Sequence, residues 1–310
     1  MRWFFLAVSL LVAVSLPCDG AVALMKAGPG VMGHGLNVRS GPAAPALPGD
    51  TVAFTAWWGL RAYSSAQLTG STNAVRVRRS SDNFEYDIKV LPSGLLDVGP
   101  GSGPLDHCTS TSCFVSIFYD QTGNNACGGA SCNCVQTTAA AQLSFVFNCL
   151  GTKPCVQSSA AAVQCISANN FTPATGTQSL HYVGGRTTGT VATVPISVGS
   201  LSRITPVGGA ANWQLLSNGG SITRAATDGA WHVAAGVAAA GANLSSLSID
   251  GVTTVGTVTP GVTVAAPLMA RGGAGATQST VEGGFIDNAV LSAGQIGALN
   301  ASARAYYGIP

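Results

Sequence analysis

The chain has 310 residues, of which 8% are charged, and its formal net charge is +2. So small a charge cannot produce the positive field that phosphate backbones require, which excludes nucleic acid as a partner. The 40 glycines and the scarcity of charged residues favour short strands and turns over long solvated helices, so the composition indicates an all-β class.

The N-terminal segment, MRWFFLAVSLLVAVSLPCDGAVA, is typical of a secretory signal peptide. It has one Arg, an apolar run from Trp3 to Leu16, and an Ala-x-Ala cleavage site that ends at Ala23. The run is about 14 residues long, whereas a transmembrane helix needs roughly 20, so no stable membrane span is predicted. We therefore expect residues 1–23 to be removed and the protein to be secreted or extracellular.

The rest of the chain divides into an irregular lead-in and one large domain. Residues 24–50 are rich in Gly, Pro and Ala and lack a periodic apolar pattern. From residue 51 onward, short β-like runs alternate with Gly, Asn and Ser turns, which favours a sandwich or jelly roll over residues 51–310. Within it, LSSLSIDGVTTVG predicts a hairpin that turns at Asp250-Gly251, with apolar residues near a period of two at Leu244, Leu247 and Ile249.

The final segment, LSAGQIGALNASARAYYG, is the exception to the β pattern and predicts one helix. Ser292 followed three residues later by Gln295 makes a capping box, and Gly308 can end the helix. The apolar residues that share one face of this helix are Ile296, Leu299 and Ala303.

Two segments resemble the amino-terminal half of the catalytic domain of fungal-type arabinofuranosidase B, a concanavalin A-like β-sandwich of the glycoside hydrolases. They are AYSSAQLTGSTNAVRVRRSSDNFEYDI, followed by GLLDV, and HCTSTSCFVSIFYDQTGN. Later strands such as DGAWHVAAGV resemble laminin-G-like lectin domains of phage and bacterial surface proteins. The resemblance implies a disulfide-stapled, concanavalin A-like sandwich and a bridge between Cys108 and Cys113.

Removal of the signal peptide would leave eight cysteines, and an even number in an exported chain indicates disulfides. We expect three further bridges among the remaining six, with the pairing open: Cys127, Cys132, Cys134, Cys149, Cys155 and Cys165. A zinc site at Cys127, Cys132, Cys134 and His107 is the alternative, because thiolate and imidazole are preferred zinc ligands. Exported thiols are usually oxidised and no Cys-x2-Cys pair occurs, so neither a metal nor a cofactor is predicted.

Hydrolysis by the retaining mechanism needs two carboxyl groups about 5 Å apart. In the arabinofuranosidase family the nucleophilic Glu lies in a His-Met-Glu-Ala stretch after two adjacent cysteines, and this chain has neither. The family's acid/base Asp follows a Gly-Gly pair, where this chain has Ala274 in ARGGAGATQSTVEGGF. Glu282 is the remaining catalytic candidate, although its VEGGF context also suits a structural role at the start of a strand.

Carbohydrate binding needs less than hydrolysis, because sugars stack on aromatic rings and bond to amides and hydroxyls. The candidate binding residues are Trp57, Trp58, Asp120, Gln121, Asn124 and Trp213. Trp57 and Trp58 are adjacent and cannot both face the core from one strand, so one of them is a candidate for exposure. The alternative is that Trp58 and Trp231 are core residues and the others partly buried, while Asp120 and Gln121 hold a turn by bonding to loop backbone.

The leading hypothesis is an exported carbohydrate-binding or surface-attachment protein whose partner is a polysaccharide or surface glycan. It would use a glycosidase-like scaffold that lacks the catalytic carboxylates. The first rival is an active arabinofuranosidase-like hydrolase. The second rival is a structural virion or appendage protein in which the sandwich self-assembles.

Overall fold

The computed structural model describes residues 46–310 except 100, 102, 159–163, 175, 187–192, 199–201, 208–210, 219, 262–263 and 273–276. The predicted signal peptide, most of the predicted lead-in and Ala274 lie outside the described residues. Residues from Ala44 onward belong to one compact unit, which thus includes the last residues of the predicted lead-in. No helix in the described part of the chain has both the length and the apolar character needed to cross a bilayer.

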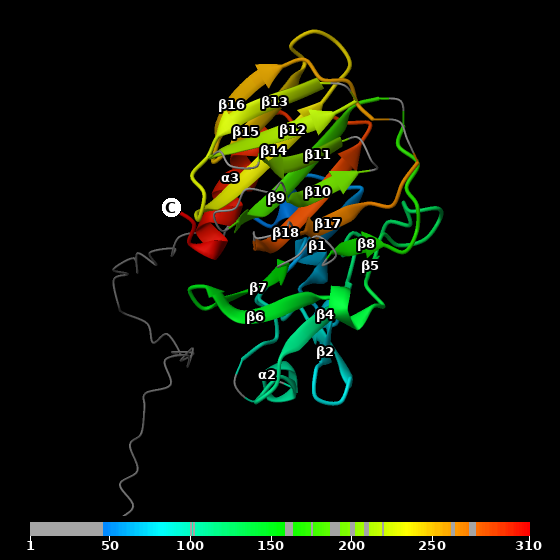
Figure 1. Ribbon diagram of the computed structural model, residues 1–310, viewed down its shortest axis with the longest axis vertical. Helices are drawn as coiled ribbons and strands as arrows, with labels where there is room; N and C mark the ends of the chain where they lie inside the picture. Colours follow the sequence, from blue (N-terminus) through cyan, green and yellow to red (C-terminus); the bar gives the residue numbers. More distant parts are fainter. Residues whose placement is uncertain are drawn as a thin grey trace, which may run out of the picture. The chain divides into compact units, whose positions relative to one another are not determined.

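The described residues fold into an all-β sandwich in which every strand pairing is antiparallel (Figure 1). The first sheet has the order β16-β15-β14-β9-β18, and both β1 and β7 pair with the other edge of β18. Its strands are β1 (Ala56–Gly59), β7 (Lys153–Ser158), β9 (Gln178–Arg186), β14 (Trp231–Ala238), β15 (Ser245–Ile249), β16 (Val252–Gly256) and β18 (Gln278–Asp287).

The second sheet has the order β3-β2-β4-β5-β8-β17-β10-β11-β12-β13. Its strands are β2 (Asn73–Arg79), β3 (Glu85–Lys89), β4 (Cys113–Phe118), β5 (Cys134–Val135), β8 (Cys165–Ser167), β10 (Val194–Val198), β11 (Ser202–Pro206), β12 (Asn212–Ser217), β13 (Gly220–Ala225) and β17 (Leu268–Arg271). Strand β6 (Leu143–Leu150) pairs with β4 and with β7, so it joins the two sheets. The helical segments are α1 (Pro48–Thr51), η1 (Ser65–Gln67), α2 (Gly103–His107), η2 (Ala139–Ala141) and α3 (Ala293–Tyr307).

The main core lies between the two sheets and contains Trp58, Phe285 and Leu215. The sheets approach so closely that a Cβ added at Gly236 of β14 would lie 2.9 Å from Leu215 of β12. A second core covers the opposite face of the first sheet, where Trp57 packs in the same cluster as residues of α3. Helix α3 therefore forms a third layer on that sheet.

Strand β1 is buried on both faces because it lies between these two cores. Trp58 belongs to the core between the sheets, whereas Trp57 packs against Phe54 in the core under α3, with ring centroids 4.8 Å apart. Both indoles are fully buried. The expectation that one of the adjacent tryptophans is exposed is therefore wrong, since it assumed that only one face of the strand is covered.

The locally encoded elements form as predicted. Ser292 caps α3 through a capping box with Gln295, and Gly308 ends the helix in the left-handed conformation. The hairpin of β15 and β16 turns at Asp250 and Gly251, with φ values of 53° and 82°. Both residues have a positive φ, which Asp and Gly tolerate better than most other residues. Leu244 departs from the predicted apolar face, because it precedes β15 and is 61% exposed.

Candidate functional site

Glu282, the remaining catalytic candidate, lies in the interior of the first sheet. It occupies β18 opposite Gly59 of β1, and its side chain is fully buried. Arg61 binds both carboxylate oxygens, with Nε donating to Oε2 at 2.6 Å and Nη2 donating to Oε1 at 2.8 Å. Tyr307 of α3 donates to Oε2 at 3.0 Å, and His181 Nε2 lies 3.4 Å from Oε1. The carboxylate is thus enclosed by the protein's own side chains.

The surroundings of Glu282 keep it ionised. Burial acts to raise the pKa of Glu282, but the charge of Arg61 and the hydrogen bonds from His181 and Arg61 lower it to about 2. A general acid must carry a proton near neutral pH and must reach the leaving group. Glu282 meets neither requirement in this structure, and its contacts join β18 to the segment after β1 and to α3.

Asp120 and Gln121 hold the loop after β4 against β1. Asp120 Oδ1 accepts from the backbone amide of Trp57 at 3.1 Å, and Oδ2 accepts from that of Cys132 at 3.2 Å. Burial raises the pKa of Asp120, and these backbone donors oppose that shift. Gln121 donates through Nε2 to the Gly59 carbonyl at 2.6 Å. Both side chains therefore bond to loop and strand backbone. This agrees with the interpretation that they hold a turn, and not with the one in which they bind a sugar.

The side chains of the other two predicted binding residues also make their contacts within the protein. Asn124 Nδ2 donates to the Phe54 carbonyl at 2.9 Å, which fastens the end of the same loop. Trp213 of β12 is 1% exposed, and its ring lies near the rings of Tyr182 and His232, with both centroid distances at 5.8 Å. The predicted residues Trp57, Trp58 and Trp213 thus present no ring face at the surface.

The eight cysteines of the described residues form four disulfides: Cys108–Cys113, Cys127–Cys132, Cys134–Cys165 and Cys149–Cys155. The bridge implied by the family resemblance and the three further bridges are therefore confirmed. The zinc interpretation of Cys127, Cys132 and Cys134 is wrong, because these sulfurs are bonded to other sulfurs. Within the described residues, no group of three or more His, Cys, Asp and Glu side chains is arranged to hold a metal ion.

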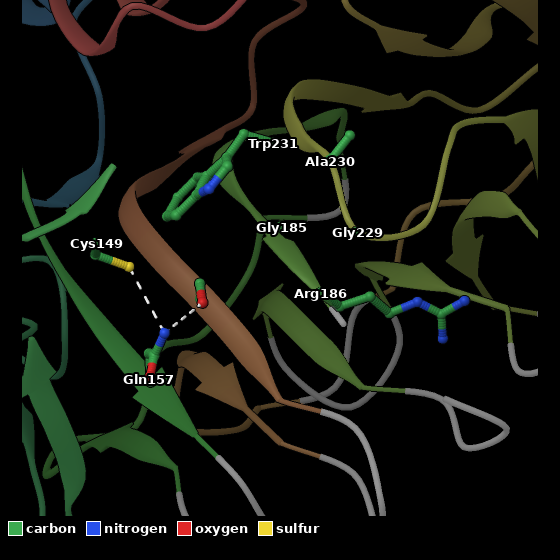
Figure 2. Close-up of a pocket in the computed structure, with 8 residues that line it drawn as sticks. Cys149, Gln157, Gly185, Arg186, Gly229, Ala230 and Trp231 are labelled. Carbon is green, nitrogen blue, oxygen red and sulfur yellow. Dashed lines mark hydrogen bonds between the residues drawn. The ribbon is translucent and has the colours of Figure 1, made fainter. Parts of the chain in front are cut away.

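A different set of residues forms a pocket of about 200 Å³ on the first sheet, between β7, β9, β14 and β18 (Figure 2). Figure 2 shows the Trp231 ring and the Gln157 amide entering it from opposite sides, whereas the Arg186 side chain points away from both. Trp231 keeps part of its surface exposed. No Asp or Glu is among the described residues that line the pocket.

The strand register explains how these side chains meet. Trp231 of β14 lies opposite Gly185 of β9, and Gly185 lies opposite Ser279 of β18. Gln157 of β7 continues the row beyond Ser279. Directly opposed residues of antiparallel strands project to the same face, so the indole, hydroxyl and amide share one surface about 14 Å long. Gly185 has no side chain, and the backbone of Ala230 lies where one would project.

The polar side of the pocket is held in place by internal bonds. Gln157 Nε2 donates to Ser279 Oγ at 3.0 Å and lies 3.6 Å from Cys149 Sγ of a disulfide. The Gln157 Oε1 atom accepts no hydrogen bond from the described residues, so it can accept one from a ligand. The Ser279 hydroxyl and this amide together offer the donors and acceptors that a sugar hydroxyl requires.

The turn that carries Trp231 is anchored from the opposite side. Arg186 binds both oxygens of Asp228 at 3.0 and 3.1 Å, and only 1% of the Arg186 side chain is exposed. A Cβ added at Gly185 would lie 2.5 Å from the Ala230 carbonyl oxygen, so glycine is needed for this close approach. The ion pair and the close backbone contact fix the start of β14, and therefore fix the position of the indole.

Sequence reasoning did not find this pocket. The sequence leaves Trp231 as a core residue in one of two interpretations and outside the predicted binding set, and nothing in the sequence singles out Gln157 or Ser279. The available signal is the position of Trp231 directly after the turn TDGA, at the start of a strand, where it keeps part of its surface exposed. The other strand members come from four different strands, and their alignment requires the register of the sheet.

The comparisons with known proteins agree with this architecture. No protein-family profile matches the chain, and no curated protein sequence matches it. The chain is similar to a GH54 α-L-arabinofuranosidase soaked with a cyclic sulfate inhibitor, with a TM-score of 0.59 and 14% identity. It is also similar to an arabinofuranosidase complexed with arabinofuranosyl-α-1,2-xylobiose, with a TM-score of 0.57 and 12% identity.

Both matches cover 80% of this chain and 62% of the solved chain, so this protein spans about three-fifths of their length. At such identities the likeness concerns the fold, and it confirms the resemblance to arabinofuranosidase at that level. The laminin-G-like resemblance stays a prediction. The chain is thus a disulfide-bonded β-sandwich of the kind found in arabinofuranosidases.

Proposed function

We propose that this protein is an exported carbohydrate-binding or surface-attachment protein, built on a glycosidase-like sandwich without the catalytic carboxylates of that scaffold. The observation that carries the proposal is the pocket of Figure 2, which combines a partly exposed indole with an amide and a hydroxyl. Aromatic rings with a few convergent polar groups suit the apolar faces and hydroxyls of a sugar. A neutral polysaccharide or surface glycan is the partner that these groups fit.

The same pocket argues against hydrolysis. A retaining glycosidase requires two carboxyl groups about 5 Å apart at the scissile bond. The described residues lining the pocket contribute none, and the nearest charged pair, Arg186 and Asp228, is engaged in a bidentate ion pair. Glu282, the other candidate, is fully buried against Arg61. Similar solved structures named as arabinofuranosidases support a sugar-binding scaffold, but the described part of this chain offers binding groups without a catalytic pair.

The binding test uses Trp231→Ala in the purified protein. Loss of the stacking surface should weaken retention on polysaccharide columns about tenfold, which corresponds to about 1.4 kcal/mol. Phe84→Ala is the matched control, because Phe84 is 58% exposed but lies outside the pocket. Retention that is equally reduced in both variants, or in neither, would contradict the assignment of the pocket.

The catalytic test uses aryl arabinofuranosides as substrates. We expect no release of arabinose by the purified protein, since no carboxylate lines the described part of the pocket. Turnover that is abolished by Glu282→Gln, in a variant whose melting transition shows that it is folded, would establish the hydrolase hypothesis instead. Export is tested by mass spectrometry of the mature N-terminus, where an intact Met1 would exclude cleavage of the signal peptide.

A further inference from the structure

A second pocket, of about 330 Å³, lies on the second sheet where β8, β10, β11 and β17 run side by side (Figure 1). It shares no lining residue with the pocket of Trp231. A cross-strand row sets its floor: Arg203 lies opposite Ser197, Ser197 opposite Leu268, and Leu268 opposite Ile166. Opposed residues share a face, so this row presents a guanidinium at one end, a hydroxyl next to it, and an apolar surface beyond.

Two arginine side chains that have no partner among the described residues distinguish this pocket. Arg203 and Arg271 both line it, and their side chains make no hydrogen bond, ion pair or ring contact within the described part of the chain. Arg203 Nε is buried and has no acceptor among the same residues. Elsewhere in the same sheet an arginine is matched to an acid, as in the bidentate pair of Arg76 with Asp87. No Asp or Glu is among the described residues lining the pocket, so its positive charge has no internal counterpart.

The backbone of β17 brings the second arginine into the pocket. Regular alternation would turn Met269 and Arg271 to the same face of the sheet. Met269 is fully buried in the core, but Ala270 between them has φ of 59°. This left-handed conformation is costly for a residue with a Cβ. Arg271, the residue after it, lines the pocket with Arg203.

We propose that this pocket binds the carboxylate of an acidic saccharide, with a uronic acid as the chemical class. Arg203 is partly buried, and a partly desolvated guanidinium without an anion is unfavourable, whereas Arg271 is exposed and adds a hydrated positive charge at the edge of the pocket. The planar fork of a guanidinium matches the two oxygens of a carboxylate. Leu268 and Ile166 supply the apolar floor for the C–H face of the sugar ring, and Ser197 supplies a hydroxyl partner. The low net charge of the chain argues against a polyphosphate ligand, which requires many cationic contacts.

The test is isothermal titration calorimetry with a trigalacturonate probe and its neutral counterpart, a trigalactose. The wild-type protein should bind the acidic probe, and its affinity should fall as sodium chloride is raised. Arg203→Gln and Arg271→Gln should each reduce that affinity at least tenfold. Arg224→Gln is the matched control, because Arg224 is a partly exposed arginine of β13 whose Nη1 donates to Thr254. Melting temperatures of all variants would show that each is folded.

The outcomes separate this site from the pocket of Trp231. Trp231→Ala should leave the affinity for trigalacturonate unchanged. The two proposals can therefore fail independently of each other. Equal affinity for the acidic and neutral probes, or equal losses in Arg224→Gln and the two pocket variants, would overturn the proposal. Displacement of the probe by an equimolar concentration of inorganic phosphate would also overturn it, since that result describes a site for small anions without a sugar.

Discussion

At the scale of single residues, Glu282 illustrates how surroundings determine what a carboxylate does. Its two oxygens bind Arg61, and the tyrosine of α3 adds a third donor. A buried ion pair is expensive to form, but removal of one partner alone leaves an uncompensated charge in the interior. The pair therefore affects the measured stability chiefly when one of its two partners is removed.

We predict that Glu282→Gln lowers the free energy of unfolding by about 3–5 kcal/mol, because Arg61 then remains charged and buried. The double variant Arg61→Met with Glu282→Leu should lose less than the single variant, since both charges are removed. Urea denaturation measures the difference, and Glu85→Gln on the exposed face of β3 is the control. A single variant as stable as the wild type would contradict a structural role for this carboxylate.

His232 and Asp250 form a second pair, which makes stability depend on pH. His232 Nδ1 lies 2.6 Å from Asp250 Oδ2. Burial acts to lower the pKa of His232, but the bonds with Asp250 and the Thr227 carbonyl outweigh it and raise that pKa. Burial acts to raise the pKa of Asp250, but the bonds with His232 and the Val233 amide lower it. The pair therefore favours the charged forms of both groups.

We predict that Asp250→Asn is most destabilising between about pH 4 and pH 6.5, the ordinary pKa values of the two groups. The raised pKa of His232 gives stability that is complete below about pH 6.5 and is lost as pH rises through the folded value. The lowered pKa of Asp250 gives stability that is complete above about pH 4 and is lost as pH falls through the folded value. Melting temperatures of the wild type and Asp250→Asn across pH measure this, with the exposed Asp106→Asn as control. A difference that is constant with pH would refute the charged pair.

At the scale of elements, the terminal helix depends on a few local signals. Ser292 accepts from the Gln295 amide, and the Gln295 side chain accepts from the Ser292 amide. We predict that Ser292→Ala lowers the free energy of unfolding by about 1 kcal/mol, because the Gln295 backbone amide loses the hydroxyl that accepts its hydrogen bond. Ser221→Ala, at an exposed position of β13, should have little effect in the same urea titration. Equal losses in the two variants would show that the cap is unimportant.

These local signals explain why α3 and the hairpin at Asp250-Gly251 could be predicted from the sequence. The residues that specify each element are within a few positions of each other, so spacing reveals them. The fate of Trp57 could not be predicted, because its burial depends on α3 packing over β1 from the far end of the chain. Whether a strand is covered on one face or two is a property of its neighbours.

At the scale of the whole molecule, the disulfides cross-link the chain over very different distances. Cys108–Cys113 joins residues 5 apart, whereas Cys134–Cys165 joins residues 31 apart and connects β5 to β8. In the chain-entropy model, closing a loop lowers the entropy of the unfolded state and so raises the free energy of unfolding. The gain is about 2 kcal/mol for Cys108–Cys113 and about 4 kcal/mol for Cys134–Cys165. The longer loop should therefore matter more to stability.

We predict that replacing Cys134 and Cys165 by Ala lowers the melting temperature more than replacing Cys108 and Cys113 by Ala. Differential scanning calorimetry of both double variants measures the effect, and the reduced wild-type protein should melt below either of them. The opposite ranking would show that native-state packing around each bridge, rather than loop length, governs its contribution.

The whole-molecule arrangement also explains why the candidate site could be predicted only in part. The shortage of carboxylates and the presence of disulfides follow from residue counts. The Trp231 pocket assembles from five strands and the two-arginine pocket from four, and strand register aligns their members.

The central position of β18 has a consequence for the order in which the protein can form. This strand pairs with β1, β7 and β9, and its Glu282 binds an arginine 221 residues earlier in the chain. Until β18 has been synthesised, β1 has no neighbour at that edge and Arg61 has no counter-ion. Pairings between such distant segments form slowly, because a long loop must close first. The first sheet can therefore close around Glu282 only after nearly all of the chain has been synthesised.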